Sequence, residues 1–357
     1  MIMLHRRALL LAMLSAGITP RALATRSTTD SAGRTVVLPD RITKVMAAGP
    51  PASVVVYCLA PTAMVGWQRS PRPEELPYLL PATHALPELG RLTGRADTAN
   101  VEVVLKAAPD LVVDFGSVRP TFVSLADATQ ERTGIPYVLI DGRFEATPAS
   151  LRQLGGILGV PERGEALARY AEDLFQRVAA MLANIPDAQR PRVYLARGPQ
   201  GLETGLRGSI NTEIIEWAGG HNVADAQDNR RGIANVSPEQ ILLWQPDVIV
   251  TWDRRFFDDV TRRPEGGWQS VPAVANRRVH LAPTAPFGWI DGPPSINRLI
   301  GLGWMANVLH GDRYPFDIRG EVRAFYKLFY HVDVGDKDLE TLIAWADGKP
   351  PGTSPRP

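Results

Sequence analysis

The sequence has little cysteine, no large excess of either charge and, beyond its first 25 residues, no long apolar run. Cys58 is the only cysteine among 357 residues, which excludes an intrachain disulfide and a thiolate metal cluster. Lysine and arginine number 39 against 38 for aspartate and glutamate, so the composition does not point to nucleic acid as a partner. No segment after the N-terminus is long enough to cross a bilayer as a helix.

Motifs for metal binding and catalysis are also missing. The histidines form no His-x-His or His-x-x-x-His pair, which disfavours a bare-metal site. There is no Gly-x-Ser-x-Gly elbow, no phosphate-binding Gly-x-x-x-x-Gly-Lys loop and no His-Glu-x-x-His pair. We expect no resident cofactor and no catalytic residues. Asp141, Asp253 and Asp291 follow predicted strands and leave an exported hydrolase or transferase as the alternative, although aspartates at such places also cap helices.

The N-terminus has the organisation of a secretory signal. Arg6 and Arg7 precede an apolar stretch over residues 8–14, and Ala22-Leu-Ala24 offers small residues for cleavage. We expect residues 1–24 to be removed on export to the periplasm by the general secretory or the twin-arginine route. At the other end, residues 349–357 are rich in proline and predict a disordered tail.

A short pattern occurs twice in the chain. Asn100-Val-Glu102 is followed by Pro109-Asp110 and a β-branched run, and Val236-Ser-Pro-Glu239 by Pro246-Asp247 and a second such run. Each copy predicts a helix that begins near the glutamate, a Pro-Asp turn and a strand buried on both faces. The two copies are too far apart for a solenoid repeat, so they predict two similar α/β lobes.

The expected order of strands and helices places these lobes before and after a long helix. Alternation of strands and helices predicts a parallel sheet with helices on both faces in each lobe. The fold class is therefore α/β, with two parallel-sheet, Rossmann-like lobes and a ligand cleft between them. The expected strands cover 42–47, 63–66, 111–113, 137–140, 192–196 and 248–250, and the expected helices 52–59, 125–133, 147–158 and 162–185. The expected domains are an N-terminal lobe over 34–145, a helical linker over 147–186 and a C-terminal lobe with terminal helices over 190–345.

In this order and spacing the motifs resemble the periplasmic solute-binding proteins of ABC importers of the helical-backbone class. The resemblance covers about residues 34–330, with the twin motifs and Glu213 to Val223 as its most specific parts. It implies capture of a metal chelate, most simply a ferric siderophore or cobalamin, and delivery to the permease. A small oxyanion such as molybdate, or a nickel chelate, is the alternative cargo. Haem is disfavoured because Gly90-Arg91-Leu92 stands where haem-binding relatives usually have a tyrosine. A role in sensing instead of transport shares all of these features.

The resemblance also assigns a partner to each lobe tip. In the family, one glutamate on each lobe docks onto arginines of the permease, and the matching positions are Glu102 and Glu239. Two carboxylates on separate lobes can report the distance between the lobes through charge-assisted hydrogen bonds. The alternative is that both are first-turn glutamates favoured by the helix dipole.

The cleft residues follow from the position of the strand ends. Ligands of open parallel sheets bind beyond the carboxyl ends of the strands. Glycine there lets backbone approach a ligand, tryptophan forms an apolar wall, and arginine binds oxyanions or chelate oxygens. Arg298 begins a predicted helix, and its alternative to ligand binding is a structural role at a helix start that Ser295 and Asn297 cap. The predicted ligand-binding residues are Gly49, Pro50, Trp67, Arg91, Arg143, Arg197, Trp252, Trp289 and Arg298.

Overall fold

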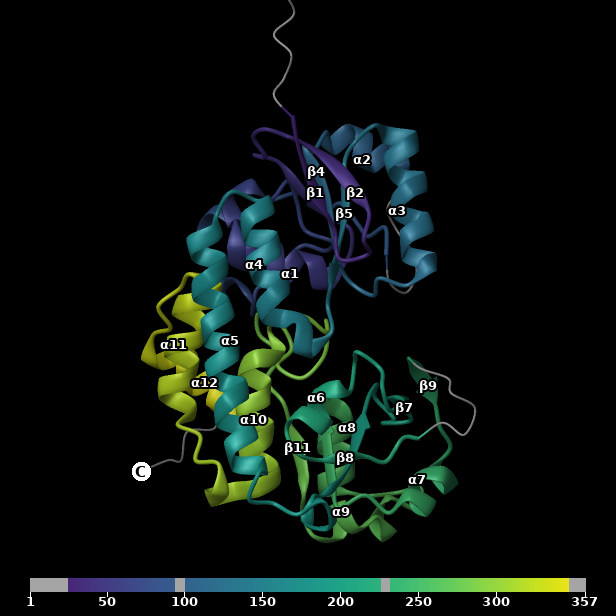
Figure 1. Cartoon of the computed structure of the whole chain (residues 1–357). Coiled ribbons are helices and arrows are strands. Elements are labelled where there is room, and N and C mark those ends of the chain that lie inside the picture. The colour runs from purple at the N-terminus through teal and green to yellow at the C-terminus, as the bar shows by residue number, and fades with distance from the viewer. Residues whose placement is uncertain (1–24, 94–99, 226–231, 347–357) are drawn as a thin grey trace, which may run out of the picture.

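A helix of 22 residues, α5 (Pro161–Leu182), runs along one side of the molecule and connects two α/β lobes (Figure 1). The computed structural model describes residues 25–93, 100–225 and 232–346. Leu167, Ala171, Leu174 and Val178 are buried on one face of α5, at the spacing of an amphipathic helix. The expected backbone helix is therefore present, and it begins and ends within three residues of the predicted bounds.

The N-terminal lobe has a three-stranded parallel sheet in the order β3-β4-β5. Alternate residues of these strands enter two hydrophobic clusters, one on each face, so the β-branched runs are covered on both sides. Its elements are β3 (Val45–Ala47), α1 (Pro50–Leu59), α2 (Val101–Ala107), β4 (Leu111–Gly116), α3 (Pro120–Thr133) and β5 (Tyr137–Asp141).

The C-terminal lobe repeats this plan with four parallel strands in the order β11-β10-β6-β8. One face of the sheet joins the main core and the other packs on α7 and α8. Its elements are β6 (Arg192–Ala196), α6 (Glu213–Trp217), β8 (His221–Asn222), α7 (Pro238–Trp244), β10 (Val248–Thr251), α8 (Arg254–Arg262), α9 (Pro272–Ala275) and β11 (Val279–Leu281).

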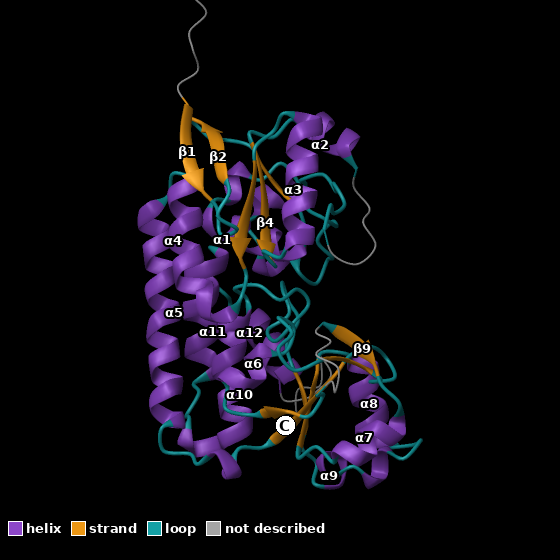
Figure 2. Cartoon of the chain, turned by 45° about the vertical axis from the view of Figure 1, so that its right-hand side comes forward, coloured by secondary structure: helices purple, strands orange, loops and turns teal. Residues whose placement is uncertain are grey.

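The last helices return from the second lobe to the first. The Tyr57 hydroxyl of α1 donates to the Tyr330 carbonyl over 2.7 Å, and the Tyr78 hydroxyl donates to the Asp338 carbonyl over 2.9 Å. A layer of helices that includes α5 thus spans both lobes (Figure 2). Over the described residues, no helix has the length and apolarity that a membrane span requires. The helices of this layer are α4 (Thr147–Ile157), α5, α10 (Arg298–His310), α11 (Ile318–Tyr330) and α12 (Asp336–Ala346).

The twin motif has the same structure in both lobes. Helices α2 and α7 each have seven residues, and the side chains of Asn100 and Ser237 accept backbone N–H groups at their starts. Each helix ends at a left-handed residue, with φ 43° at Ala108 and 44° at Gln245. The aspartate that follows then accepts backbone N–H groups at the start of the neighbouring strand: Asp110 Oδ2 from Thr43 and Lys44, and Asp247 Oδ2 from Arg192. The repeat predicted from sequence is therefore a repeat in space.

Other elements differ from the prediction. The strand expected at 63–66 is a 3-10 helix (Pro61–Ala63) followed by one isolated bridge between Val45 and Met64. Helix α3 begins at Pro120, five residues before the expected start, because proline is well suited to the first helical turn. Two antiparallel strand pairs were not predicted. They are the hairpin of β1 (Thr25–Thr29) with β2 (Thr35–Pro39), and the pair of β7 (Glu203–Gly205) with β9 (Ile233–Asn235), which are distant in sequence.

Helix α10 packs directly on the loop that carries Trp289. A Cβ atom built on Gly301 would lie 1.8 Å from the Trp289 carbonyl oxygen, so this contact requires glycine. We expect Gly301→Ala to lower the free energy of unfolding by about 1–3 kcal/mol through overpacking, measured by urea denaturation. Gly156→Ala in α4 is the control, since no atom lies within 4 Å of its added Cβ. It should instead be neutral or stabilising, and equal losses in both variants would contradict this packing.

Candidate functional site

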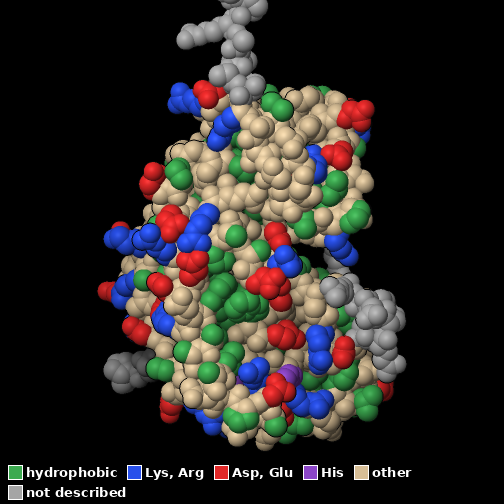
Figure 3. Space-filling model, in the orientation of Figure 1, with side chains coloured by type: hydrophobic (Ala, Val, Ile, Leu, Met, Phe, Trp, Pro, Cys, Tyr) green, Lys and Arg blue, Asp and Glu red, His purple; other side chains and the backbone are tan. Residues whose placement is uncertain are grey.

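The carboxyl ends of both sheets face the space between the lobes. The loop after β5 reaches the second lobe, where the Gly142 carbonyl accepts a hydrogen bond from Arg298 over 3.1 Å. The loop before α10 reaches the first lobe, where the Ser295 hydroxyl donates to the Pro51 carbonyl over 2.7 Å. In the space-filling view the surface is hollowed between the lobes, with acidic and basic side chains around the hollow (Figure 3). This is the place at which the sequence predicts ligand binding.

The first-lobe side of the cleft is built around Gly49. This residue precedes α1, and Pro50 occupies the first turn of the helix. A Cβ on Gly49 would lie 2.5 Å from Thr93 Oγ1, so a larger residue would displace the neighbouring segment. The backbone N–H of Leu92 donates to the Ala48 carbonyl over 2.7 Å, which holds the half-buried Arg91 beside this turn. Gly49, Pro50 and Arg91 are therefore brought together.

The second-lobe side is built around Arg197, which follows β6. Its guanidinium lies over the ring of Trp252, 5.1 Å from the centroid, and Trp252 follows the neighbouring strand β10. Arg197 Nη1 lies 3.0 Å from Glu203 Oε1, and Nε lies 3.4 Å from Asp291 Oδ2. The Arg197 side chain is only 14% exposed, yet neither of these two nitrogens makes a hydrogen bond of normal geometry with the described residues. The charge of Arg197 is therefore paired with two carboxylates, and its guanidinium is held between them and the Trp252 ring.

A buried carboxylate holds Arg197 in place. Asp291 is 1% exposed and accepts hydrogen bonds from Asn211 Nδ2 over 3.0 Å and from the Gly292 backbone over 2.7 Å. Burial raises the pKa of Asp291, and the charge of Arg197 offsets part of that rise. Sequence reasoning noted Asp291 only as a possible acid or base and missed Asn211 and Glu203. Nothing in their local sequence indicates that they meet Arg197.

Two of the predicted tryptophans lie in the hydrophobic core. Trp67 is 4% exposed and donates from Nε1 to the Thr83 carbonyl over 2.8 Å. Trp289 is fully buried, and its Nε1 donates to the Tyr326 hydroxyl over 3.1 Å. Both indoles thus pack under the cleft loops, and of the three predicted tryptophans only Trp252 is partly exposed beside Arg197.

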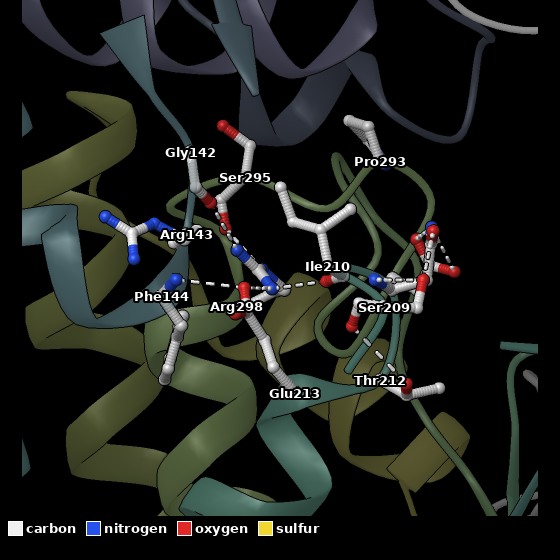
Figure 4. Close-up of polar contacts among 12 residues, drawn as sticks. Gly142, Arg143, Phe144, Ser209, Ile210, Thr212, Glu213, Pro293, Ser295 and Arg298 are labelled. Carbon is white, nitrogen blue, oxygen red and sulfur yellow. Dashed lines mark hydrogen bonds and ion pairs between the residues drawn. The ribbon is translucent and has the colours of Figure 1, made fainter. Parts of the chain in front are cut away.

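Arg143 points away from the guanidinium of Arg298 and toward solvent (Figure 4). Its side chain is 62% exposed and pairs with Asp141 over 2.7 Å and with Glu145 over 2.8 Å. Such an exposed pair is screened by water and contributes little to stability. The structure therefore places Arg143 at the rim and satisfies its charge locally.

Arg298 connects the lobes from within. It is 1% exposed and donates to Glu213 Oε1 over 2.8 Å and to the Ile210 carbonyl over 2.7 Å in the second lobe, in addition to Gly142 in the first. The same Glu213 oxygen accepts the Phe144 backbone N–H over 2.9 Å (Figure 4). Burial raises the pKa of Glu213, and Arg298 counteracts that rise. The guanidinium is thus bonded to protein on both sides of the cleft floor.

The start of α10 at Arg298 is not capped by the side chains of Ser295 and Asn297, which was the alternative that the sequence offered. Asn297 precedes α10, but its Oδ1 accepts no N–H group of the helix, while its Nδ2 donates to the carbonyls of Gly288 and Pro293. Ser295 bonds to Pro51 in the other lobe. These side chains therefore fix the loop before α10 and connect it to the first lobe.

The two glutamates of the twin motif lie at the outer ends of the lobes. Glu102 is on α2 and Glu239 is on α7, and both side chains are exposed. Helices α2 and α7 lie on the side of the molecule away from α5 in two views (Figures 1 and 2). The hydroxyl of Ser237 lowers the pKa of Glu239, which keeps this carboxylate charged. Each lobe thus presents one anionic side chain at its tip.

The aspartates weighed as catalytic groups have structural partners. Asp253 Oδ1 accepts the Phe256 backbone N–H over 3.0 Å and caps α8. Asp141 accepts hydrogen bonds from Arg143. Within 25–93, 100–225 and 232–346, no three His, Cys, Asp or Glu side chains converge on a metal-sized site. The expected signal at 1–24 and the tail at 349–357 lie outside the described residues.

Known proteins share this architecture. A model of the periplasmic binding protein family matches residues 55–286. The molybdate-binding protein MolA of Haemophilus influenzae is 25% identical over 91% of this chain and 96% of its own length. An ABC transporter solute binding protein from Sulfurospirillum deleyianum has 32% identity and a TM-score of 0.80, over 89% of this chain and 98% of that chain.

A third relative is matched over a shorter region. The vitamin B12-binding protein of Pectobacterium carotovorum is 31% identical over 42% of this chain and 53% of its own length. The chain thus spans about half the length of that relative.

Proposed function

The chain belongs to the periplasmic binding protein family, and on that premise we propose that it is the solute-binding component of an ABC importer and takes a small oxyanion of the molybdate class. A cleft between two parallel-sheet lobes is the usual place for a ligand in this architecture. The full-length similarity to a molybdate-binding relative supports this class of cargo.

The observation that carries the proposal is the state of Arg197. Its Nη1 and Nε atoms face Glu203 and Asp291, and its guanidinium lies over the ring of Trp252, so the side chain has a fixed orientation after β6. A guanidinium fixed in this way can direct its remaining N–H groups toward an oxyanion in charge-assisted hydrogen bonds. Gly49 and Arg91 supply the facing wall from the first lobe.

A metal chelate, which is the first expectation from the sequence, is the second candidate here. Trp252 beside Arg197 is a combination that suits an anionic chelate with an organic surface, because the ring offers apolar contact and the arginine binds oxygen. The burial of Trp67 and Trp289 removes two of the three indoles that the sequence predicts as an apolar wall for a large ligand such as cobalamin. For that reason we place the oxyanion first.

The proposal includes export and docking. We infer that residues 1–24 direct the protein to the periplasm and that Glu102 and Glu239 dock onto cationic side chains of the permease. Support for docking comes from the equivalent positions of the two carboxylates on α2 and α7, in helices of equal length with equivalent ends. A role in sensing would use the same cleft but no permease.

Substitution of Arg197 tests the site. We expect Arg197→Ala to weaken molybdate binding by about ten- to hundredfold, since a hydrogen bond to a charged group is worth about 1.5–3 kcal/mol. Arg197→Lys keeps the charge opposite Asp291 but loses the planar fork, so its affinity should lie between those of the parent protein and Arg197→Ala. Calorimetric titration with sodium molybdate measures both.

Arg143→Ala is the matched control for Arg197→Ala. It removes the same charge from the rim, where Arg143 is already paired with Asp141 and Glu145, so its affinity should stay within about twofold of the parent. If Arg197→Ala binds molybdate as the parent does, while its thermal melt is also unchanged, Arg197 is not a ligand contact.

A further inference from the structure

One turn of the second lobe takes part in the junction between the lobes. Residues 209–213 lead into α6, and this turn holds the buried Arg298 side chain (Figure 4). Arg298 Nη1 donates to the Ile210 carbonyl over 2.7 Å and to Glu213 Oε1 over 2.8 Å. Nη2 of the same guanidinium donates to the Gly142 carbonyl of the first lobe over 3.1 Å. The position of the turn is therefore set in part by the first lobe.

The same turn also reaches the cleft. Asn211 follows Ile210 in the chain, and its Nδ2 donates to the two carboxylate oxygens of Asp291 over 3.0 and 3.2 Å. Asp291 Oδ2 lies 3.4 Å from Nε of Arg197. Within the part of the chain that the structure describes, the other hydrogen bond to this carboxylate comes from the backbone of its neighbour Gly292. Asn211 therefore connects the turn to the carboxylate that faces Arg197.

The turn is packed tightly, and the amide of Asn211 has a defined orientation. Thr212 is fully buried, and its hydroxyl donates to the Leu206 carbonyl over 3.0 Å. A Cβ built on Gly205 of β7 would lie 2.6 Å from Thr212 Cγ2, so the turn rests directly on this strand. The buried Ser209 hydroxyl donates to Asn211 Oδ1 over 3.2 Å, which leaves Nδ2 for Asp291. Chains of packed side chains and hydrogen bonds of this kind can couple two sites.

We propose that Asn211 is a positioning residue for solute binding, which holds Arg197 in place through Asp291. It thereby couples this arginine to the lobe junction at Arg298. The inference rests on the proposed function, in which Arg197 contacts the solute. An arginine that is already oriented loses less conformational entropy when it binds. Displacement of the first lobe from its contact at Gly142 would free the turn, loosen the arginine and weaken its hold on the solute.

The test is a double-mutant cycle on the affinity for molybdate, measured by calorimetric titration at a temperature where every variant is folded. Asn211→Leu keeps a side chain of similar size but removes the hydrogen bonds to Asp291. We expect it to weaken binding about three- to tenfold in the parent protein. In the Arg197→Ala variant it should weaken binding less than twofold, because the arginine that it positions is absent. Asn211→Gln keeps an amide donor and should retain more affinity than Asn211→Leu.

Asn307→Leu is the matched control for Asn211→Leu. Asn307 is also a half-buried asparagine, but it lies in α10, and its Nδ2 donates to the Tyr314 carbonyl over 2.9 Å. Its replacement should lower the melting temperature and leave the affinity for molybdate within about twofold of the parent. Equal losses of affinity in both variants would mean that any lost hydrogen bond weakens binding, and the positioning role would be wrong.

A second cycle tests the link to the lobe junction. Arg298→Lys keeps a cation beside Glu213 but loses the planar fork that also reaches Ile210 and Gly142. We expect it to weaken molybdate binding in the parent protein, and to weaken it less than twofold further in Asn211→Leu. Losses that simply add in the double variant would contradict coupling through the turn.

These variants also separate the inference from the proposed function. If Arg197→Ala weakens molybdate binding while Asn211→Leu binds like the parent, the positioning role is wrong and the proposed ligand contact stands. If Arg197→Ala binds molybdate like the parent, or if the parent does not bind it, the proposed function fails and the inference fails with it.

Discussion

Replacement of the buried Arg298 by methionine is expected to lower the free energy of unfolding by about 3 kcal/mol, because it leaves the partly buried Glu213 carboxylate without its cation. Arg298 also donates to the carbonyls of Ile210, Gly142 and Ser295, so four acceptors from two lobes lose a hydrogen bond together. Urea denaturation followed by circular dichroism measures the loss.

The pH dependence of this loss identifies its cause. Burial already raises the pKa of Glu213 in the folded protein, and without Arg298 the pKa should rise further. A carboxyl whose pKa is higher in the folded than in the unfolded state destabilises the fold as pH increases through that interval. The loss in free energy of unfolding caused by Arg298→Met should therefore be smaller at pH 5 than at pH 8. Adding Glu213→Gln should recover part of this loss.

Arg152→Met is the matched control for Arg298→Met. Arg152 also bonds to carboxylates, those of Glu165 and Glu172 at 2.6 and 2.5 Å, but its side chain is 37% exposed. We expect its loss to stay below about 1 kcal/mol. Equal effects of the two substitutions would contradict the assignment of Arg298 as a buried connection between lobes.

Removal of both tip carboxylates is expected to abolish solute uptake while leaving solute affinity unchanged. In the Glu102→Ala, Glu239→Ala double variant the cleft is intact, because both residues lie on the outer helices α2 and α7. Each lobe would still bind its share of the ligand, but neither could pair with a cationic side chain of the permease. Uptake of labelled solute by cells that carry the variant measures the effect, and calorimetry measures affinity.

A second double variant controls for the loss of negative charge. Glu74 and Glu340 are exposed carboxylates on other parts of the molecule, and their replacement by alanine changes the net charge equally. Uptake should then stay near the parent level. Normal uptake by the Glu102→Ala, Glu239→Ala variant would mean that docking uses another surface or that the protein does not serve a transporter.

The twin motif was predictable because its signals are local. A capping residue, a first-turn glutamate, Pro-Asp and a β-branched run each have a conformational preference that neighbours in sequence determine. The missed β1–β2 hairpin lacked such a signal. Val36 and Leu38 are buried while Val37 between them is exposed, so the sequence shows an unbroken apolar run where the structure alternates. Strands β7 and β9 have three residues each, too few for a periodic pattern.

The site was predictable only as a set of loops. The rule that ligands bind beyond strand ends selected Arg197 and Trp252, which meet in the structure. It also selected Trp289 and Arg298, whose side chains turn into the core and the lobe junction. Whether a loop side chain faces the cleft depends on packing partners distant in sequence, such as Tyr326 for Trp289. Sequence position alone does not contain that information.

The most direct test of the central claim is a calorimetric titration of the purified protein with molybdate, a ferric siderophore, cobalamin, haemin and nickel-histidine. We expect saturable one-to-one binding of an anionic solute, with molybdate as the first candidate, at micromolar or tighter affinity and with a change in Trp252 fluorescence. Absence of binding across this panel, by a protein that melts cooperatively, would contradict the assignment of the cleft as a site for anionic solutes.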